Sequence, residues 1–161
     1  MSRILCWLVI MAGVQGAALY GGAHVILNGT PSLPMGLYWR LARPAALEPG
    51  MLVELSPPDA VIPFMEQLPV GAHLLKQIAG GPGDMVCWRT EEMAVNGFPV
   101  AQRRSPRPLA VVVVGCRTLA EDDLVVIGQH PQSLDSRDIG PIDRRRVLYR
   151  VVPVWTWGAT S

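Results

Sequence analysis

An uncharged apolar stretch at the N-terminus constrains this chain more than any other feature. Residues 4–27 contain no aspartate, glutamate, lysine or arginine, and only Gln15 and His24 interrupt the apolar and small residues. At about 1.5 Å per residue, a helix of this length can cross a hydrocarbon layer about 30 Å thick. The sequence therefore predicts an N-terminal membrane anchor over residues 1–28, followed by one domain over residues 29–161.

A cleavable signal peptide is the alternative interpretation of this stretch. Arg3 gives it a charged start, and residues 21–23 are small, as at a cleavage site. Its apolar core is longer than the roughly 7 to 15 residues of a signal peptide, so we favour a retained anchor. Charge bias leaves the orientation open, because Arg3 on one side faces Arg40 and Arg43 on the other.

The remainder reads as short strands set between turns rich in glycine and proline, which predicts a mainly β domain. The strands are expected at residues 51–55, 73–79, 85–88, 111–114, 124–127 and 147–157, the last one bent at Pro153. A tight turn at residues 80–84 should return the chain from the second strand to the third, and Asn96 with Gly97 predicts a hairpin. A brief helix is expected after Asp59, and an exposed loop over residues 103–108.

Charge and cysteine content exclude several classes of function. The net charge is +1, which gives no reason to expect a nucleic-acid partner. No Cys/His cluster suggests a metal, and no motif suggests a cofactor, so we expect neither. Cys87 and Cys116 either form a disulfide, which would require an oxidising compartment, or remain as two buried free thiols.

Lys76 is the only lysine among fourteen basic residues, and it follows two leucines in a strand-like segment. An apolar setting lowers the pKa of a lysine amine, whereas a guanidinium stays charged. Lys76 is therefore a candidate general base. Chance drift toward arginine in the genome is the alternative explanation.

Two further segments carry polar groups in constrained positions. Ser32 lies between Pro31 and Pro34 in a loop directly after the apolar stretch, where the prolines restrict the backbone and hold the hydroxyl in place. A serine activated by a neutral lysine is an established catalytic pair, although an ordinary turn serine fits the segment alone. Residues 128–141 form a polar segment after an apolar strand, a position that often lines a site; an ion pair that shapes a turn is the alternative.

Taken together and in this order, residues 32–38, 75–84 and 133–141 resemble the motifs of the type I signal peptidases. The likeness is closer to the TraF-type conjugative-transfer peptidases, in which the serine motif looks like Ser-x-Pro-x-Gly-x-Tyr, as it does here from Ser32 to Tyr38. The resemblance covers nearly the whole chain.

The resemblance implies a signal-peptidase-like antiparallel β domain with one N-terminal transmembrane helix. It implies a catalytic dyad in which Ser32 is the nucleophile and Lys76 the general base. Supporting roles are implied for Ser133, which would orient the lysine, for Asp135 with Arg137, which would support the site, and for Thr30, which would contribute to the oxyanion hole.

The same resemblance implies a single-pass protein of the bacterial inner membrane, with its catalytic domain on the periplasmic side. Its substrate would be a membrane-tethered precursor, such as a conjugative pilin subunit, and the choice between hydrolysis and cyclisation stays open. A housekeeping signal peptidase is the second enzyme interpretation. A non-catalytic membrane β protein of a transfer or secretion assembly is the alternative from another class.

Overall fold

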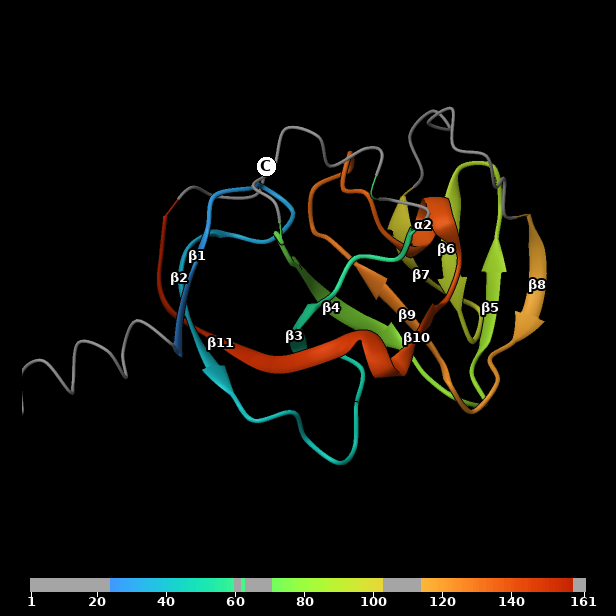
Figure 1. Ribbon diagram of the computed structural model, residues 1–161. Coiled ribbons are helices and arrows are strands. Elements are labelled where there is room, and N and C mark those ends of the chain that lie inside the picture. Colours follow the sequence, from blue (N-terminus) through green and yellow to red (C-terminus); the bar gives the residue numbers. More distant parts are fainter. Residues whose placement is uncertain (1–23, 60–61, 63–70, 103–113, 158–161) are drawn as a thin grey trace, which may run out of the picture.

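Two antiparallel sheets form the described part of the protein. The computed structural model describes residues 24–59, 62, 71–102 and 114–157, and Figure 1 follows their order along the chain. The seven-stranded sheet has the order β1 (Val25–Asn28), β2 (Met35–Leu41), β11 (Val147–Trp157), β3 (Leu52–Leu55), β4 (Leu74–Gly80), β9 (Asp123–Ile127) and β10 (Ile142–Asp143). The four-stranded sheet has the order β7 (Phe98–Gln102), β6 (Glu92–Val95), β5 (Met85–Trp88) and β8 (Gly115–Thr118). Two short helical turns, α2 (Ser136–Ile139) and η2 (Arg144–Arg146), precede β10 and β11.

Several predicted elements are confirmed. Strands β3, β4, β5 and β9 coincide with expected strands within one residue, and β11 is interrupted between Pro153 and Trp155 as predicted. Strands β6 and β7 form the hairpin at Asn96 and Gly97, whose φ angles of 51° and 84° are both positive. Positive φ at both central residues is what a type I′ turn requires, and asparagine followed by glycine provides it with little strain.

The expected hairpin between β4 and β5 is wrong. Strand β4 pairs with β3 and β9, whereas β5 pairs with β6 and β8 in the other sheet. The turn itself is present, and Asp84 Oδ2 accepts a hydrogen bond of 2.8 Å from the Gly81 backbone N–H. It carries the chain from one sheet to the other (Figure 1), because both edges of β4 are already paired with strands distant in sequence.

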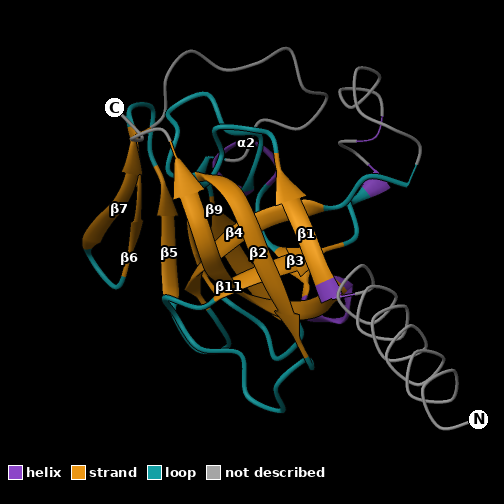
Figure 2. Ribbon diagram, turned by 90° about the vertical axis from the view of Figure 1, so that its left-hand side faces the viewer, coloured by secondary structure: helices purple, strands orange, loops and turns teal. Residues whose placement is uncertain are grey.

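The end of the predicted membrane span also differs from expectation. Val25–Asn28 form strand β1, which pairs with β2 from Val25 opposite Trp39 to Asn28 opposite Gly36. These residues therefore belong to the β domain, and Figure 2 shows β1 lying along β2. Residues 1–23, which hold most of the predicted anchor, lie outside the described residues. Among the described residues, no helix is long and apolar enough to span a membrane.

Other expectations fall mostly outside the described residues. The predicted loop at residues 103–108 does so entirely, as does most of the helix expected after Asp59. Of the buried strand expected at residues 111–114, only Val114 is described; it is 70% exposed and lies outside any strand, so burial is wrong for this residue.

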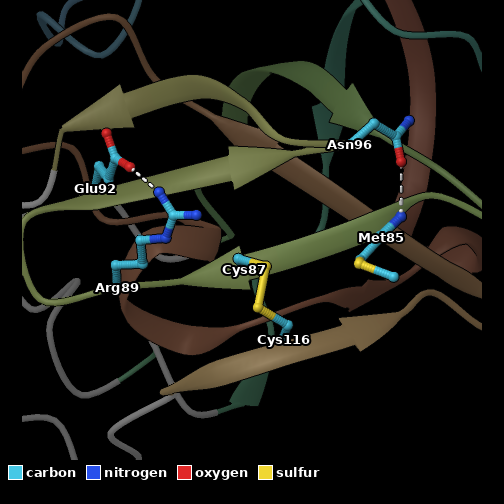
Figure 3. The surroundings of a disulfide bond; sticks show 6 residues. All are labelled: Met85, Cys87, Arg89, Glu92, Asn96 and Cys116. Carbon is cyan, nitrogen blue, oxygen red and sulfur yellow. Dashed lines mark hydrogen bonds and ion pairs between the residues drawn. A yellow bond between two sulfur atoms is a disulfide. The ribbon is translucent and has the colours of Figure 1, made fainter.

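Cys87 and Cys116 form a disulfide, which decides between the two alternatives left open by the sequence. They lie directly opposite each other on β5 and β8, and their Sγ atoms are 2.06 Å apart (Figure 3). The same view shows the Arg89 to Glu92 ion pair and the Asn96 side chain that accepts from the Met85 N–H. The disulfide links the edge strand β8 covalently to the four-stranded sheet.

One apolar cluster joins the two segments that carry Ser32 and Lys76. Leu33, Tyr38, Leu75 and Val151 pack together and are at most 5% exposed. Leu33 follows Ser32 and Leu75 precedes Lys76, so this cluster fixes the backbone of both segments against each other. Burial of each such side chain contributes about 1.5–3 kcal/mol, enough to hold the loop firmly on the sheet.

Candidate active site

The loop that carries Ser32, which we call the nucleophile loop (residues 29–34), connects β1 to β2 and is organised by Asn28. The Asn28 side chain is 4% exposed. Its Nδ2 group donates to the carbonyls of Leu33 at 3.0 Å and Pro34 at 3.1 Å. The Pro34 carbonyl also accepts from the Tyr38 hydroxyl at 2.6 Å. The loop therefore has little freedom to change shape.

Ser32 is held through both its side chain and its backbone. Its Oγ lies 3.0 Å from Thr30 Oγ1, and Thr30 Oγ1 donates to Asn28 Oδ1 at 3.1 Å. The Ser32 carbonyl accepts from the Gln129 N–H at 2.6 Å, which ties the nucleophile loop to the segment after β9. The serine is half-buried and lines a cavity.

Lys76 lies in the middle of β4 and is 3% exposed. Its Nζ donates to Ser133 Oγ at 2.7 Å. Because β4 is paired on both edges, with Lys76 opposite Val53 of β3, the lysine backbone is fixed within the sheet. A buried ammonium group is disfavoured relative to the neutral amine unless charged partners compensate.

Gly128 is the point where the serine and lysine segments meet. A Cβ atom at Gly128 would lie 2.1 Å from Ser133 Oγ and 2.9 Å from the Ser32 carbonyl oxygen. The hydroxyl that contacts Lys76 and the backbone of the candidate nucleophile therefore both pack directly on Gly128. Only a residue without a side chain fits between them.

Asp135 and Arg137 form a buried ion pair that shapes the segment containing Ser133. They are 1% and 3% exposed, and Arg137 Nη2 lies 2.7 Å from Asp135 Oδ2. The same carboxylate oxygen accepts from the Gly128 N–H at 2.7 Å, while Arg137 Nη2 donates to the carbonyls of Gly128 and His130. Burial alone would lower the pKa of Arg137, but the hydrogen bond and charge of Asp135 raise it above its usual value. The Arg137 guanidinium is therefore charged, and it lies directly against the Asp135 carboxylate.

A second buried charged group borders the nucleophile loop. Glu54 of β3 is fully buried and accepts from Arg40 Nε at 2.6 Å and Nη2 at 2.8 Å, with His73 Nδ1 also 2.6 Å away. Burial alone would raise the pKa of Glu54, but the hydrogen bonds from Arg40 and His73 outweigh burial and lower it. Glu54 is therefore a carboxylate at neutral pH.

A cavity of about 490 Å³ runs from the nucleophile loop to this charged group. It is lined by Thr30, Ser32, Arg40, Glu54 and His73, and by apolar residues that include Leu27 and Leu74. The cavity therefore borders both the candidate nucleophile and the buried charged group.

The structure brings the predicted site residues together in two contact groups that meet at Gly128. One contains Thr30 and Ser32; the other contains Lys76, Ser133, Asp135 and Arg137. The ion pair that the sequence left as an alternative role for Asp135 and Arg137 is present. It also makes hydrogen bonds to the Gly128 N–H and carbonyl, next to the Ser133 side chain that contacts Lys76. The supporting role stays a prediction.

The sequence interpretation missed Asn28, Gly128 and the Arg40, Glu54 and His73 group. The Asn-x-Thr-x-Ser spacing contained a signal for Asn28, since asparagine side chains commonly accept from the backbone two residues on. Gly128 and the charged group depend on contacts between distant segments, for which the local sequence contains no signal.

Comparison with known proteins supports a common origin over nearly the full chain. The family model described as signal peptidase, peptidase S26 matches residues 1–157. Two proteins described as plasmid transfer protein TraF, both from Escherichia coli, are similar to this chain. The first is 28% identical over 180 residues, covering 98% of this chain and all of the relative. The second is 29% identical over 162 residues, covering 89% of each.

Among solved structures, a signal peptidase I from Enterococcus faecalis V583 is similar, with a TM-score of 0.44 and 17% identity over 68% of this chain and all of that chain. The family match extends over both the nucleophile loop and the Lys76 segment. This chain belongs to the signal peptidase family, peptidase S26.

Proposed function

We propose that the chain is a membrane-anchored serine endopeptidase that uses Ser32 and Lys76 as a dyad to process an exported precursor protein. One observation carries the proposal: the buried Lys76 amine donates to Ser133 Oγ, and Ser133 packs on the same glycine as the Ser32 carbonyl. Membership of the peptidase S26 family supports a peptidase-like role.

The surroundings of Lys76 favour a neutral amine, as a base requires. Burial disfavours an ammonium ion, and the Ser133 hydroxyl that Lys76 Nζ contacts carries no charge that would offset this penalty. The adjacent Asp135 and Arg137 pair adds no net charge, because each is neutralised by the other. A guanidinium at position 76 would stay protonated, so arginine could not act as the base there.

The reaction begins when Ser32 Oγ attacks the substrate carbonyl and its proton passes to Lys76 Nζ. The tetrahedral intermediate collapses to an ester on Ser32, and the Lys76 ammonium returns the proton to the departing amine. Water then attacks the ester, losing a proton to Lys76, and Ser32 recovers its proton as the acid product leaves. If an amine of the substrate attacks instead, the same proton transfers close a ring and no water is consumed.

Thr30 is the proposed hydroxyl donor to the oxyanion. Its Oγ1 lies 3.0 Å from Ser32 Oγ, close enough to approach the oxygen that becomes negative during attack. In the resting structure this hydroxyl donates to Asn28, so it must turn toward the oxyanion when substrate binds. One such donor typically contributes about 3–4 kcal/mol to transition-state stabilisation.

The apolar outer face of β1, β2 and β11 supports a location at a membrane surface. Leu27, Leu37 and Trp155 are aligned across the three strands, and Leu27 and Trp155 are 63% and 68% exposed. Trp157 adds a second exposed tryptophan at the same end. Tryptophan is enriched where proteins meet the membrane interface. Together with the apolar N-terminal stretch before β1, this face supports a membrane-anchored domain, and the Cys87–Cys116 disulfide supports the periplasmic side, because disulfides persist in oxidising compartments.

The proposed substrate is a membrane-tethered precursor, such as a conjugative pilin subunit. The nucleophile loop follows directly after β1, so Ser32 lies a few residues from the apolar N-terminal stretch. Similarity to proteins described as plasmid transfer proteins supports a role in conjugation.

The test uses the full chain in detergent with a precursor peptide, analysed by mass spectrometry. Wild type should cleave it, whereas Ser32→Ala and Lys76→Arg should be folded and inactive. A circular product would be lighter than the linear one by one water. Cleavage by Lys76→Arg would exclude the base role. No cleavage by wild type, with a precursor still recovered as a bound partner, would support the non-catalytic alternative, and broad processing of unrelated secretory precursors would support a housekeeping signal peptidase.

A further inference from the structure

We propose that Asn28 is a positioning residue for the nucleophile, whose carboxamide sets both the shape of the nucleophile loop and the direction of the Thr30 and Ser32 hydroxyl protons. The inference rests on the proposed peptidase activity for its kinetic consequences. The hydrogen bonds that carry it exist independently of that activity.

The Asn28 carboxamide uses its full hydrogen-bonding capacity within the loop. Its two N–H groups donate to the carbonyls of Leu33 and Pro34. Its Oδ1 accepts from the Thr30 backbone N–H at 3.3 Å and from Thr30 Oγ1 at 3.1 Å. A carboxamide has two N–H donors and two acceptor sites, so all four are occupied. If the carboxamide were flipped, its oxygen would face the carbonyl oxygens of Leu33 and Pro34, which cannot donate a hydrogen bond. The hydrogen bonds therefore fix the orientation of the carboxamide.

This orientation determines where the hydroxyl protons lie. Asn28 Oδ1 can only accept, so the single hydroxyl proton of Thr30 lies between Thr30 and Asn28. Thr30 Oγ1 must then accept in its contact with Ser32 Oγ at 3.0 Å. The Ser32 proton therefore points toward Thr30 in the resting structure.

Two movements must follow when the reaction starts. The Ser32 hydroxyl rotates from Thr30 so that its proton can pass to Lys76. The Thr30 hydroxyl then no longer accepts a hydrogen bond from Ser32. It breaks its own hydrogen bond to Asn28 Oδ1 and donates to the oxyanion. Asn28 thus fixes the starting positions of both hydroxyl groups. Loss of its side chain should therefore lower kcat far more than it changes KM.

The kinetic test compares Asn28→Ala and Asn28→Asp with wild type on a precursor peptide. Asn28→Ala removes all four of these hydrogen bonds and should lower kcat about 10- to 100-fold with KM changed less than about threefold, because the Thr30 and Ser32 hydroxyls lose their fixed positions. Ile142→Val serves as the control, because it removes one methyl group from the apolar core at β9 and β10. It should lower Tm and leave kcat unchanged. If Asn28→Ala loses no more kcat than this control, the inference is wrong.

The Asn28→Asp variant separates positioning from stability. Its carboxylate still accepts from Thr30 but cannot donate to Leu33 and Pro34, whereas the protonated carboxyl can donate one bond. The ratio of its kcat to that of wild type should therefore rise as the pH falls. A ratio independent of pH would contradict the role assigned to the N–H groups. Thr30→Ser should retain most activity and Thr30→Val should not, because only serine keeps the hydroxyl.

Amide hydrogen exchange tests the inference without any substrate. The Gln129 N–H donates to the Ser32 carbonyl, so its exchange reports the position of the nucleophile loop. Exchange at Gln129 should accelerate at least about tenfold in Asn28→Ala and stay unchanged in Ile142→Val. If wild type cleaves no precursor but this difference appears, the proposed function fails and the positioning role stands. If wild type cleaves and Gln129 exchange is unaffected, the positioning role fails alone.

Discussion

Replacing Gly128 with alanine should disable the candidate site while leaving the fold intact. The added methyl group would lie 2.1 Å from Ser133 Oγ, 2.6 Å from Ser133 Cβ and 2.9 Å from the Ser32 carbonyl oxygen. Gly128 does not adopt a left-handed backbone conformation, so alanine meets no backbone strain there. The contacts with the two site segments alone resist the substitution, and one or both segments must move.

The size of the effect follows from the bonds that this movement breaks. Ser133 Oγ must retreat by about 1.3 Å, from 2.1 Å to the 3.4 Å at which ordinary contact begins, and this breaks or weakens its 2.7 Å hydrogen bond with Lys76 Nζ. Overpacking of this kind costs about 1–3 kcal/mol of stability. If about 2–3 kcal/mol of transition-state stabilisation is lost with the lysine's position, kcat should fall roughly 30- to 150-fold.

The assay is steady-state cleavage of a precursor peptide, with thermal denaturation measured in parallel. Gly81→Ala is the matched control, because a Cβ there finds its nearest neighbour, Leu124 Cδ2, at an ordinary 3.7 Å. We expect Gly81→Ala to retain kcat and Gly128→Ala to lose it, although both remain folded. A folded Gly128→Ala enzyme with wild-type kcat would refute the reasoning that the site is assembled on this glycine.

Three further predictions concern stability. Asp135→Asn leaves Arg137 buried without a counter-charge and should lower the free energy of unfolding by about 3–5 kcal/mol in urea denaturation; a loss below about 1 kcal/mol would contradict the burial of this pair. The pKa of Glu54 is lower in the folded protein than in the unfolded chain, so Glu54 stabilises the fold above its unfolded pKa of about 4.3 and the stabilisation is lost as the pH falls through its folded pKa. The difference in stability between wild type and Glu54→Gln should therefore shrink on acidification below about pH 4, and a difference that grows would contradict this assignment. Replacing both Cys87 and Cys116 with serine removes a covalent bond between residues 29 positions apart and should lower the free energy of unfolding by about 3–4 kcal/mol. Equal stability of the oxidised wild type and the double variant would argue against the disulfide.

Local sequence signals predicted the elements whose conformation depends on neighbouring residues. The Asn96 and Gly97 turn and the interruption of β11 after Pro153 follow from backbone restrictions within a few positions, and the polar segment after β9 follows from the local change in composition. The order of the three motifs in the sequence was sufficient to predict Ser32 as the nucleophile and Lys76 as the general base, because the motifs can be identified from residue types and spacing alone.

What the sequence could not predict depends on pairing between distant segments. An apolar run does not distinguish the end of a membrane helix from a strand, so Val25–Asn28 were expected in the anchor rather than in β1. A tight turn indicates a change of direction but not the partner, so β4 and β5 were expected to pair. Gly128 gains its importance only where the Ser32 and Ser133 segments meet.

The most direct test of the central claim is identification of the residue that becomes acylated. A reaction with precursor peptide is quenched with acid during turnover, digested and mapped by mass spectrometry. We predict that the acyl group of the substrate is attached to Ser32 in wild type and that none is attached in Lys76→Arg. Product formation with the acyl group on another residue, or acylation of Ser32 in Lys76→Arg at the wild-type rate, would contradict the Ser32 and Lys76 dyad.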